Sequence, residues 1–235
     1  SLHDAYKSIS ESLIHAGANL NSKVDIKWIL SEDLDSKNIK KNLTNIDGVI
    51  VAPGFGERGV EGKISAIKHV RENNIPFFGI CLGMQCACIE FSRNVLKNKN
   101  AHSTEFDKNT PYPVIDLMEG QKNIKNKGGT MRLGSYNCSL EKGSLVYKTY
   151  KSNEIKERHR HRYEFNNSFK KEFNDNGMLT SGVNKKLNLV EVIELKNHPW
   201  FSGTQYHPEY RSRVLKPHPL FISFVKKIKS IKNGQ

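Results

Sequence analysis

The stretch Ile75-Pro-Phe-Phe-Gly-Ile-Cys81-Leu-Gly-Met-Gln85 decides the fold of this 235-residue chain. Its first half is short and apolar, which is typical of a buried strand, and the residues from Leu82 onward favour a helix. Cys81 therefore lies at a strand-to-helix turn, with Gly79 and Gly83 two residues away on either side. Small neighbours permit the strained backbone of a nucleophile elbow, and a helix N-terminus favours the thiolate. The pattern predicts a nucleophile rather than a small packing residue.

Composition narrows the class of protein. Charged residues make up 26% of the chain and hydrophobic residues 37%, which is typical of a globular protein, and the length suits one domain over residues 1–235. No apolar run approaches the ~20 residues of a membrane span, so we expect a soluble protein. The four cysteines follow no signal peptide and lack metal-type spacing, which predicts reduced thiols in the cytoplasm. Cys86 and Cys88 fall inside the expected helix and are interpreted as packing residues.

The net charge of +13 raises the alternative of a nucleic-acid-binding protein, since phosphate neutralisation needs clustered Lys and Arg. The lysines are instead scattered, and many stand among asparagines in expected helices and loops. Solvated helix faces account for most of them. We therefore expect no nucleic-acid partner.

Hydrophobic patterns along the first half predict strands that alternate with helices. The expected strands cover residues 24–30, 47–52 and 75–80, and the expected helices cover residues 4–17, 60–73 and 82–91. This order predicts an α/β fold with an open, mostly parallel central sheet flanked by helices. Because a helix opens the chain where a βα fold normally has a strand, we expect a first strand before residue 1.

The second half changes to short extended runs from Thr130 onward. These runs predict a smaller antiparallel portion, which also returns residues 200–206 to the main sheet as a strand. Residues 157–165 are expected as one charged strand with Arg and His on opposite faces. Residues 220–231 carry an apolar stripe and predict a closing amphipathic helix.

Two further stretches belong with Cys81. The glycine-rich turn Pro53-Gly-Phe-Gly-Glu-Arg-Gly59 follows the strand before Cys81, so both turns should meet at the carboxyl edge of a parallel sheet. The last expected strand leads into His207-Pro-Glu209, where residues two apart in an extended segment project to one side. A carboxylate beside an imidazole selects its tautomer and stabilises its protonated form. Cys81, His207 and Glu209 are therefore the candidate catalytic residues.

These motifs together resemble a known family. Gly79-Ile-Cys81-Leu-Gly83-Met-Gln85 with His207-Pro-Glu209 resembles the class I (triad) glutamine amidotransferases. The match is closest to the amidotransferase domain of the CTP synthases, over about residue 4 to about residue 225. The stretches that carry this closer resemblance are Asp4-Ala-Tyr-Lys-Ser8, Gly59-Val-Glu-Gly62, Ser103-Thr-Glu-Phe106, Gly128-Gly-Thr-Met-Arg-Leu-Gly134, Glu157-Arg-His-Arg-His-Arg-Tyr-Glu164 and Asn197-His-Pro-Trp-Phe201.

The resemblance implies a role for each site residue. Cys81 would form a thioester with L-glutamine, His207 would move protons, and Glu209 would orient His207. The backbone N–H groups of Gly54 and Leu82 would bind the oxyanion. The residues implied around the glutamine are Gly54, Leu82, Gly83, Met84, Gln85, Glu105 for the α-amino group, and Arg162 for the α-carboxylate.

The resemblance also implies partners. The ammonia would pass to an ATP-dependent synthase domain of the same polypeptide, absent from this sequence, which aminates UTP to CTP. No cofactor is expected here, since ATP, UTP, Mg²⁺ and the activator GTP belong to the full enzyme, itself a homo-oligomer (tetramer). No metal site is expected either, because His159 and His161 lack further ligands at useful spacing. One departure is Pro53, which stands where the family has a glycine and offers no N–H.

Two alternatives remain open from the sequence. A γ-glutamyl hydrolase or peptidase of similar fold would share Cys81 and His207, but would have no reason for the runs at residues 128–134 and 157–164. A non-catalytic basic scaffold would bind nucleic acid and show salt-dependent affinity.

Overall fold

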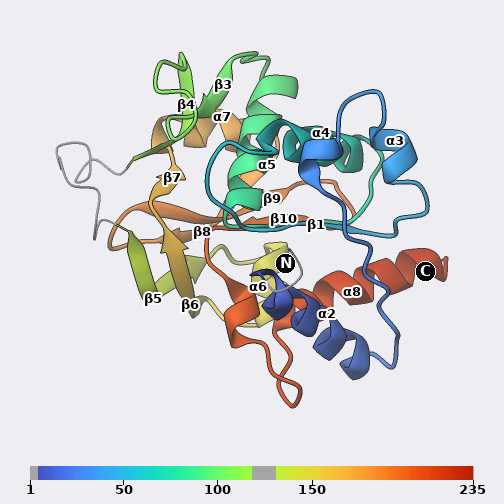
Figure 1. The fold of residues 1–235 in the computed structure, drawn as a ribbon. Coiled ribbons are helices and arrows are strands. Elements are labelled where there is room, and N and C mark those ends of the chain that lie inside the picture. The colour runs from blue at the N-terminus through green and yellow to red at the C-terminus, as the bar shows by residue number, and fades with distance from the viewer. Residues whose placement is uncertain (1–4, 118–130, 235) are drawn as a thin grey trace.

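The computed structural model describes residues 5–117 and 131–234, and within them two sheets (Figure 1). The larger sheet has seven strands. Their order is β1 (Val49–Val51), β2 (Phe77–Ile80), β10 (Phe201–Thr204), β9 (Leu189–Leu195), β8 (Met178–Asn184), β5 (Arg132–Leu140) and β6 (Glu154–His161). Strands β1, β2 and β10 pair in parallel, and the ladder from β10 to β6 is antiparallel. A smaller sheet joins β3 (Ala101–Ser103), β4 (Tyr112–Leu117) and β7 (Tyr163–Phe165).

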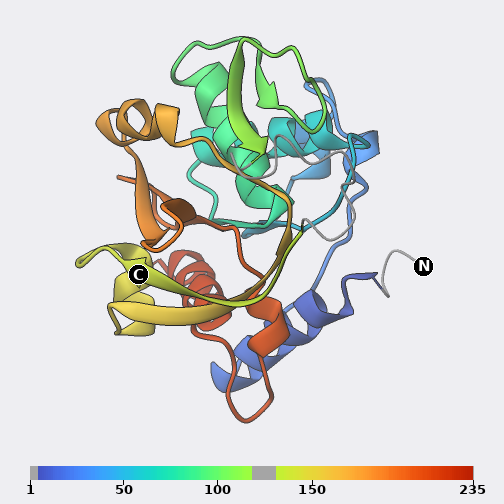
Figure 2. The ribbon, with the colours of Figure 1, turned by 90° about the vertical axis from the view of Figure 1, so that its left-hand side faces the viewer.

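Helices cover both faces of the larger sheet, as Figures 1 and 2 show. One face carries α4 (Val60–Glu72) and α5 (Leu82–Asn94), with the short α3 (Ile39–Asn42) and α7 (Lys170–Asp175) on the same side. The opposite face carries α2 (Lys7–Asn19), α6 (Leu145–Tyr150) and α8 (Pro219–Lys232). Three 3₁₀ turns complete the described elements: η1 (Ser31–Asp33), η3 (Asn167–Phe169) and η4 (Pro208–Arg211). The predicted α/β class, with its central sheet, flanking helices and nucleophile elbow, is confirmed.

The two faces explain why β2 is apolar at every position. Neighbouring side chains of a strand point to opposite faces, and here both faces are buried. Phe77 joins the core under α4 and α5, whereas Phe78 joins the core under α8. The predicted closing helix is confirmed as α8, which buries Phe221 and Phe224 against the sheet.

Several expected elements differ from the structure. Residues 24–30 alternate in exposure as a strand would, but no ladder partner lies beside them among the described residues, so they form no strand. Helix α2 continues past Gly17 to Asn19. The chain then folds back over Gly17, and the Ser22 N–H donates to the Gly17 carbonyl. The antiparallel part is larger than expected and continues the same sheet. The helices α6 and α7 and the strand β3 were not predicted.

The expected strand over residues 157–165 is in fact two strands. Strand β6 ends at His161 in the larger sheet, and β7 begins at Tyr163 in the smaller one. The alternation of burial along β6 is as predicted, with His159 and His161 buried and Arg158 and Arg160 exposed. Asp4, the first residue of the expected helix, and residues 128–130 of the glycine run lie outside the described residues. In residues 5–117 and 131–234, no helix is both long and apolar enough to cross a bilayer.

Candidate active site

Cys81 occupies a strained position at the start of α5. Its φ is 53° and its ψ is −104°, a backbone conformation that non-glycine residues rarely adopt. The packing of α5 against the sheet holds it there: a Cβ on Gly79 would lie 2.7 Å from the Gly83 carbonyl carbon, and a Cβ on Gly83 would lie 2.1 Å from the Val51 carbonyl oxygen. The Cys81 N–H also donates to the Thr204 carbonyl at 2.7 Å. The elbow inferred from the sequence is thus present in the backbone.

The Cys81 thiol is buried, with 3% of the residue exposed. Its Sγ lies 4.0 Å from the Arg160 carbonyl oxygen and accepts from Gln205 Nε2 at 3.6 Å. Burial raises the pKa of Cys81 strongly, the charge of Glu209 raises it further, and the Leu82 N–H lowers it. The helix N-terminus therefore lowers the pKa of the thiol, as expected, but burial raises this pKa by more. The resting thiol is protonated as a result.

His207 and Glu209 form a close, buried pair. His207 Nδ1 lies 2.7 Å from Glu209 Oε1, and both residues are at most 5% exposed. The segment is not extended as expected, since Pro208 starts the 3₁₀ turn η4 and the turn brings the two side chains together. Nδ1 donates in this bond, so a neutral imidazole has its lone pair at Nε2, and Nε2 has no hydrogen-bond partner. The imidazole also stacks on Tyr210, with ring centroids 4.8 Å apart.

Strand pairing brings this pair to the end of β2 where Cys81 lies. Strand β10 runs parallel to β2, and its last residue, Thr204, bonds the Cys81 N–H. The His207 N–H donates to the Arg158 carbonyl at 2.8 Å, and the neighbouring Arg160 carbonyl lies at the Cys81 thiol. Strand β6 thus contacts both candidate residues, His207 through the Arg158 carbonyl and Cys81 through the Arg160 carbonyl. Since His207 Nε2 is unpaired, it does not yet bond the thiol; such bonds often form only with substrate bound.

The glycine-rich turn after β1 lies beside Cys81, as its position in the sequence predicts. A Cβ on Gly54 would lie 3.3 Å from Leu82 Cδ2, so the two expected oxyanion residues are neighbours. The Pro53 carbonyl accepts from the Tyr6 hydroxyl at 3.0 Å. The Gly56 N–H lies 3.5 Å from Glu105 Oε1, which brings the expected glutamine-binding carboxylate to the same turn.

Of the other expected glutamine-binding residues, Gln85 and Arg162 interact with Tyr163. Gln85 is buried and donates from Nε2 to the Tyr163 carbonyl at 3.0 Å. Burial and the Glu105 charge raise the pKa of the Tyr163 phenol, while Arg162 lowers it. Met84 is different, since its side chain is fully buried in the core under β10 against Gly203.

Sequence reasoning missed one residue at the site. Gln205 is fully buried and contacts the Cys81 sulfur, and its Oε1 accepts from Gln85 Nε2 at 3.1 Å. Its position two residues before His207 was the signal in the sequence that could have indicated a site residue. No periodic pattern marks a single buried amide.

Sequence reasoning also missed a buried polar cluster behind the site. Arg132 on β5 lies between two buried carboxylates, with Nη2 2.6 Å from Glu191 Oε1 and Nη1 3.4 Å from Glu164 Oε1. Burial raises the pKa of Glu191 to about 7. It also raises the pKa of Glu164 well above its ordinary value, and Arg132 opposes both shifts. His159 Nδ1 and His161 Nε2 bond each other at 2.8 Å, and burial lowers the pKa of both imidazoles. In residues 5–117 and 131–234, no group of three or more His, Cys, Asp or Glu side chains could hold a metal ion.

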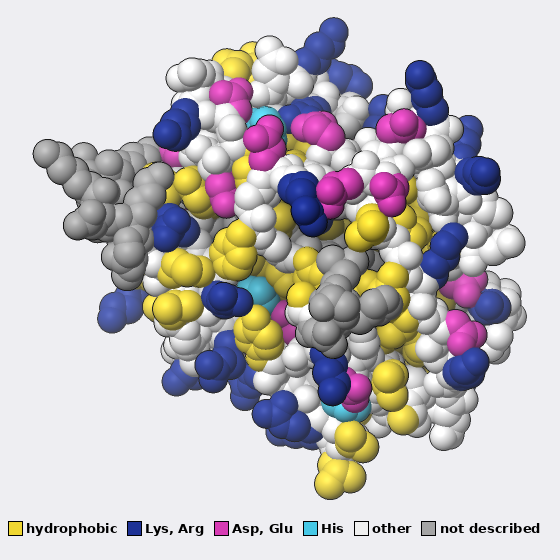
Figure 3. Space-filling view, viewed as in Figure 1, with side chains coloured by type: hydrophobic (Ala, Val, Ile, Leu, Met, Phe, Trp, Pro, Cys, Tyr) yellow, Lys and Arg dark blue, Asp and Glu magenta, His cyan; other side chains and the backbone are white. Residues whose placement is uncertain are grey.

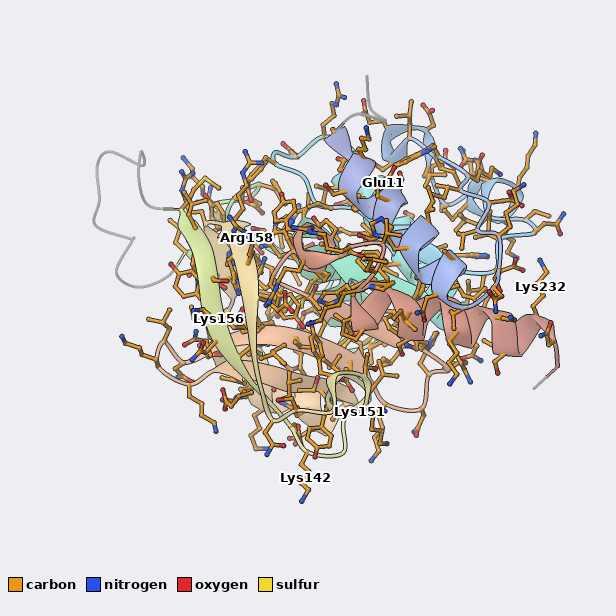
Figure 4. All side chains as sticks on the ribbon, turned by 90° about the horizontal axis from the view of Figure 1, so that it is seen from below. Glu11, Lys142, Lys151, Lys156, Arg158 and Lys232 are labelled. Atoms are coloured by element: carbon orange, nitrogen blue, oxygen red, sulfur yellow. The ribbon has the colours of Figure 1, made fainter. Side chains whose placement is uncertain are left out.

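The basic residues spread over the surface. On the face in Figure 3, Lys and Arg lie both at the rim and in the middle, and Asp and Glu stand among them, most of them in the upper half. A hollow of about 420 Å³ beside Tyr210 is lined by basic side chains that include Lys156 and Arg158, which Figure 4 labels on β6. No continuous basic stripe of the kind that follows a phosphate backbone is visible on the face in Figure 3.

Comparison with known proteins gives the family. The model of the glutamine amidotransferase class-I family matches residues 1–227. The CTP synthases of Christiangramia forsetii and Chloroherpeton thalassium are 59% and 61% identical over 225 and 232 residues, which are 96% and 98% of this chain. Those residues are 41% and 42% of the two relatives, so the chain spans less than half of their length.

A solved structure agrees with this assignment. The glutaminase domain of Trypanosoma brucei CTPS with bound acivicin superposes with a TM-score of 0.91 at 37% identity. The match covers 97% of this chain and 89% of that one. With its buried elbow cysteine and neighbouring His–Glu pair, the chain belongs to the class I glutamine amidotransferase family, among the glutaminase domains of CTP synthases.

Proposed function

We propose that this chain is the glutaminase part of a CTP synthase, which hydrolyses the side-chain amide of L-glutamine to glutamate and ammonia. The observation that carries the proposal is the meeting of the strained Cys81 with the His207–Glu209 pair at one end of β2 and β10. The names of the relatives support the same assignment.

In the proposed reaction, Cys81 passes its proton to His207 Nε2 and its sulfur attacks the amide carbon. The unpaired lone pair at Nε2 suits it to take this proton, and Glu209 stabilises the resulting imidazolium. The imidazolium protonates the departing amine, which leaves as ammonia, and a thioester remains. His207 then takes a proton from water, the hydroxyl attacks the thioester, and glutamate leaves as the Cys81 thiol reforms.

The substrate would bind between the glycine-rich turn and Tyr163. The N–H groups of Gly54 and Leu82 would stabilise the oxyanion, and loss of one such donor typically costs ~10²–10³ in rate. Glu105 would bind the α-amino group and Arg162 the α-carboxylate, for which a planar guanidinium is well suited. Gly83, Met84 and Gln85 complete the proposed glutamine site.

The remaining partners are part of the same proposal. Ammonia would pass to a synthase domain that uses ATP and Mg²⁺ to aminate UTP, with GTP as activator. None of these would bind as a cofactor within this domain. The synthase partner is supported by the length of the relatives, since the chain spans 41% and 42% of two CTP synthases. A tetrameric full enzyme in the cytoplasm completes the proposal.

The test is glutamine hydrolysis by the chain and by two cysteine variants, with the synthase part of a relative supplied in trans. Cys81→Ala should lower turnover by at least about 10³-fold, since it removes the nucleophile. Cys88→Ala is the matched control, because Cys88 is fully buried in the core: it should keep turnover and lower stability by about 1 kcal/mol.

The arms of this test separate the alternatives. Turnover that rises when the synthase part is added would support the assignment to a CTP synthase. Full turnover in Cys81→Ala would refute the mechanism. Cleavage of a γ-glutamyl peptide in preference to glutamine would favour the hydrolase alternative, and salt-dependent binding of DNA or RNA without any turnover would favour the basic scaffold.

A further inference from the structure

Gln205 places a buried amide against the reactive sulfur. It follows the last residue of β10, none of it is exposed, and its N–H donates to the Glu191 carbonyl at 2.8 Å. Its side chain extends to Cys81, where Nε2 lies 3.6 Å from Sγ. This is within the range of an N–H···S hydrogen bond.

The orientation of this amide follows from its partners. A backbone carbonyl can only accept, so Gln85 must direct its NH₂ group at the Tyr163 carbonyl, 3.0 Å away. The same nitrogen lies 3.1 Å from the Gln205 side chain, which must therefore present its oxygen there. The Gln205 NH₂ group is left to face Cys81. The carbonyl of Tyr163 thus determines the orientation of both side-chain amides, and the Cys81 sulfur accepts a hydrogen bond from the Gln205 amide nitrogen.

We propose that the Gln205 amide is a catalytic donor that stabilises the Cys81 thiolate. When the thiol passes its proton to His207 Nε2, the sulfur becomes an acceptor with a full negative charge. The Gln205 Nε2–H bond to it then becomes charge-assisted and stronger. The Leu82 N–H supplies a second donor from the start of α5.

The surroundings of Cys81 make such a donor necessary. The sulfur is buried, and the carboxylates that act on it come from three elements: Glu209 on η4, Glu164 on β7 and Glu105 after β3. All three raise the pKa of the Cys81 thiol, as burial does. Tyr210 also interacts electrostatically with Cys81, and the imidazole of His207 stacks on Tyr210. Local N–H donors are therefore needed to offset a setting that disfavours the anion.

The test replaces the donor and measures the thiolate directly. Gln205→Glu keeps the shape and the acceptor for Gln85 but puts a carboxylate oxygen against the sulfur, and Gln205→Met removes the amide altogether. The matched control is Ser202→Ala on β10, the strand that Gln205 follows, because Ser202 is equally buried and its Oγ donates to the Ile193 carbonyl. The probe is iodoacetamide, and the alkylation rate of the Cys81 peptide is followed by mass spectrometry across pH.

Loss of a hydrogen bond to a charged group corresponds to about a tenfold to hundredfold drop in thiolate population. We expect Cys81 alkylation to slow by that factor in both Gln205 variants, and the rise of the rate with pH to begin at a higher pH. In Ser202→Ala the rate and its pH dependence should stay unchanged. Near-equal alkylation profiles in all four proteins would overturn the proposal. Because the resting thiol is protonated and 3% exposed, alkylation is followed to high pH, and a parent profile that rises at no lower pH than those of the Gln205 variants would also overturn the proposal.

Folding and turnover are read separately. Circular dichroism and thermal unfolding identify a variant that fails to fold, and the two Gln205 variants differ enough in polarity that one serves if the other fails. The inference rests on the proposed function for its effect on turnover, where we expect kcat to fall with KM little changed. Alkylation needs no glutamine, so it tests the role of Gln205 even if the chain does not hydrolyse glutamine.

Discussion

At the scale of single residues, Cys81 combines backbone strain with a buried thiol. A positive φ at a non-glycine residue costs of order 1–3 kcal/mol, and it persists only where surrounding contacts determine it. Here the approach of α5 to β1 and the bond to Thr204 supply those contacts. This backbone conformation places the sulfur at the end of β10. Gln205 and His207 come directly after that strand in the chain.

Glu209 is predicted to act through its charge. Glu209→Gln keeps an oxygen near His207 Nδ1 but removes the charge that stabilises the imidazolium. We expect glutamine turnover to fall by about 10²–10⁴, in the range seen when a triad carboxylate becomes an amide. Steady-state kinetics over pH measures this effect.

A second buried glutamate provides the matched control. Glu194 accepts from the Leu145 and Val146 N–H groups at 2.8 Å each and so holds the first turn of α6. Glu194→Gln should keep turnover near that of the parent and lower the unfolding free energy by about 1–3 kcal/mol. Equal turnover in Glu209→Gln and Glu194→Gln would contradict the role given to Glu209.

At the scale of elements, β5, β6, β7 and β9 meet around the buried cluster of Arg132, Glu191, Glu164, His159 and His161. The cluster anchors the point where the chain leaves the larger sheet at His161 and enters the smaller one at Tyr163. The carbonyl of Tyr163 is the one that orients Gln85. The cluster therefore supports the polar chain that ends at Cys81.

The cluster predicts a pH-dependent contribution to stability. The pKa of Glu191 is raised from 4.5 to about 7 in the folded chain, so the folded state binds this proton more tightly than the unfolded state. That stabilisation is complete below about pH 4.5 and is lost as pH rises to about 7. The unfolding free energy of Glu191→Gln relative to the parent should therefore rise by up to about 3 kcal/mol across this window.

Urea unfolding of both proteins at about pH 5 and about pH 8 measures that difference. The comparison with the variant is needed because His159 and His161 act in the opposite sense. Their pKa values are lowered by burial, so they make the folded state gain stability as pH rises toward 6.5. Parallel pH profiles for Glu191→Gln and the parent would contradict the prediction.

At the scale of the whole molecule, stability depends on two cores that share one sheet. Phe78 makes edge-on contacts with Phe221 on α8 and with Trp200 just before β10, and both ring centroids lie 5.4 Å from that of Phe78. Phe77 contacts Phe201, with ring centroids 4.4 Å apart, under the opposite helices. Strand β2 thus lies within both cores and carries Cys81 at its end.

Phe221→Ala is expected to destabilise the whole molecule. Phe221 is fully buried, and truncation of such a ring costs about 3–5 kcal/mol through lost burial and the cavity that remains. Denaturant unfolding should show a lower midpoint, with turnover retained under conditions where the variant is folded. Leu215→Ala is the control, because Leu215 is 99% exposed and should change the midpoint little. A midpoint unchanged in Phe221→Ala would contradict the packing described for α8.

Much of this arrangement could be predicted because its causes are local in sequence. The elbow depends on Gly79 and Gly83, two residues from Cys81 on either side. The His207–Glu209 pair depends on a separation of two residues, although a 3₁₀ turn rather than a strand brings the pair together. The closing helix follows from its own apolar stripe.

Other features depended on partners that no local pattern specifies. Residues 24–30 alternate like a strand, yet a strand needs a neighbour, and periodicity reports burial rather than pairing. The break between β6 and β7 depends on which sheet each half joins, and α6 is held at its first turn by Glu194, a residue from a distant strand.

The sequence by itself predicted Cys81 as the candidate nucleophile, and it located the elbow and the histidine–glutamate pair, because each depends on residues within a few positions of one another. Only the tertiary structure decided the state of the thiol. Burial holds the Cys81 proton, and the amide that reaches its sulfur comes from Gln205, which is 124 residues away along the chain. Desolvation and long-range hydrogen bonds exist only once the sheet has formed, and they set the reactivity of a cysteine that the sequence had already located.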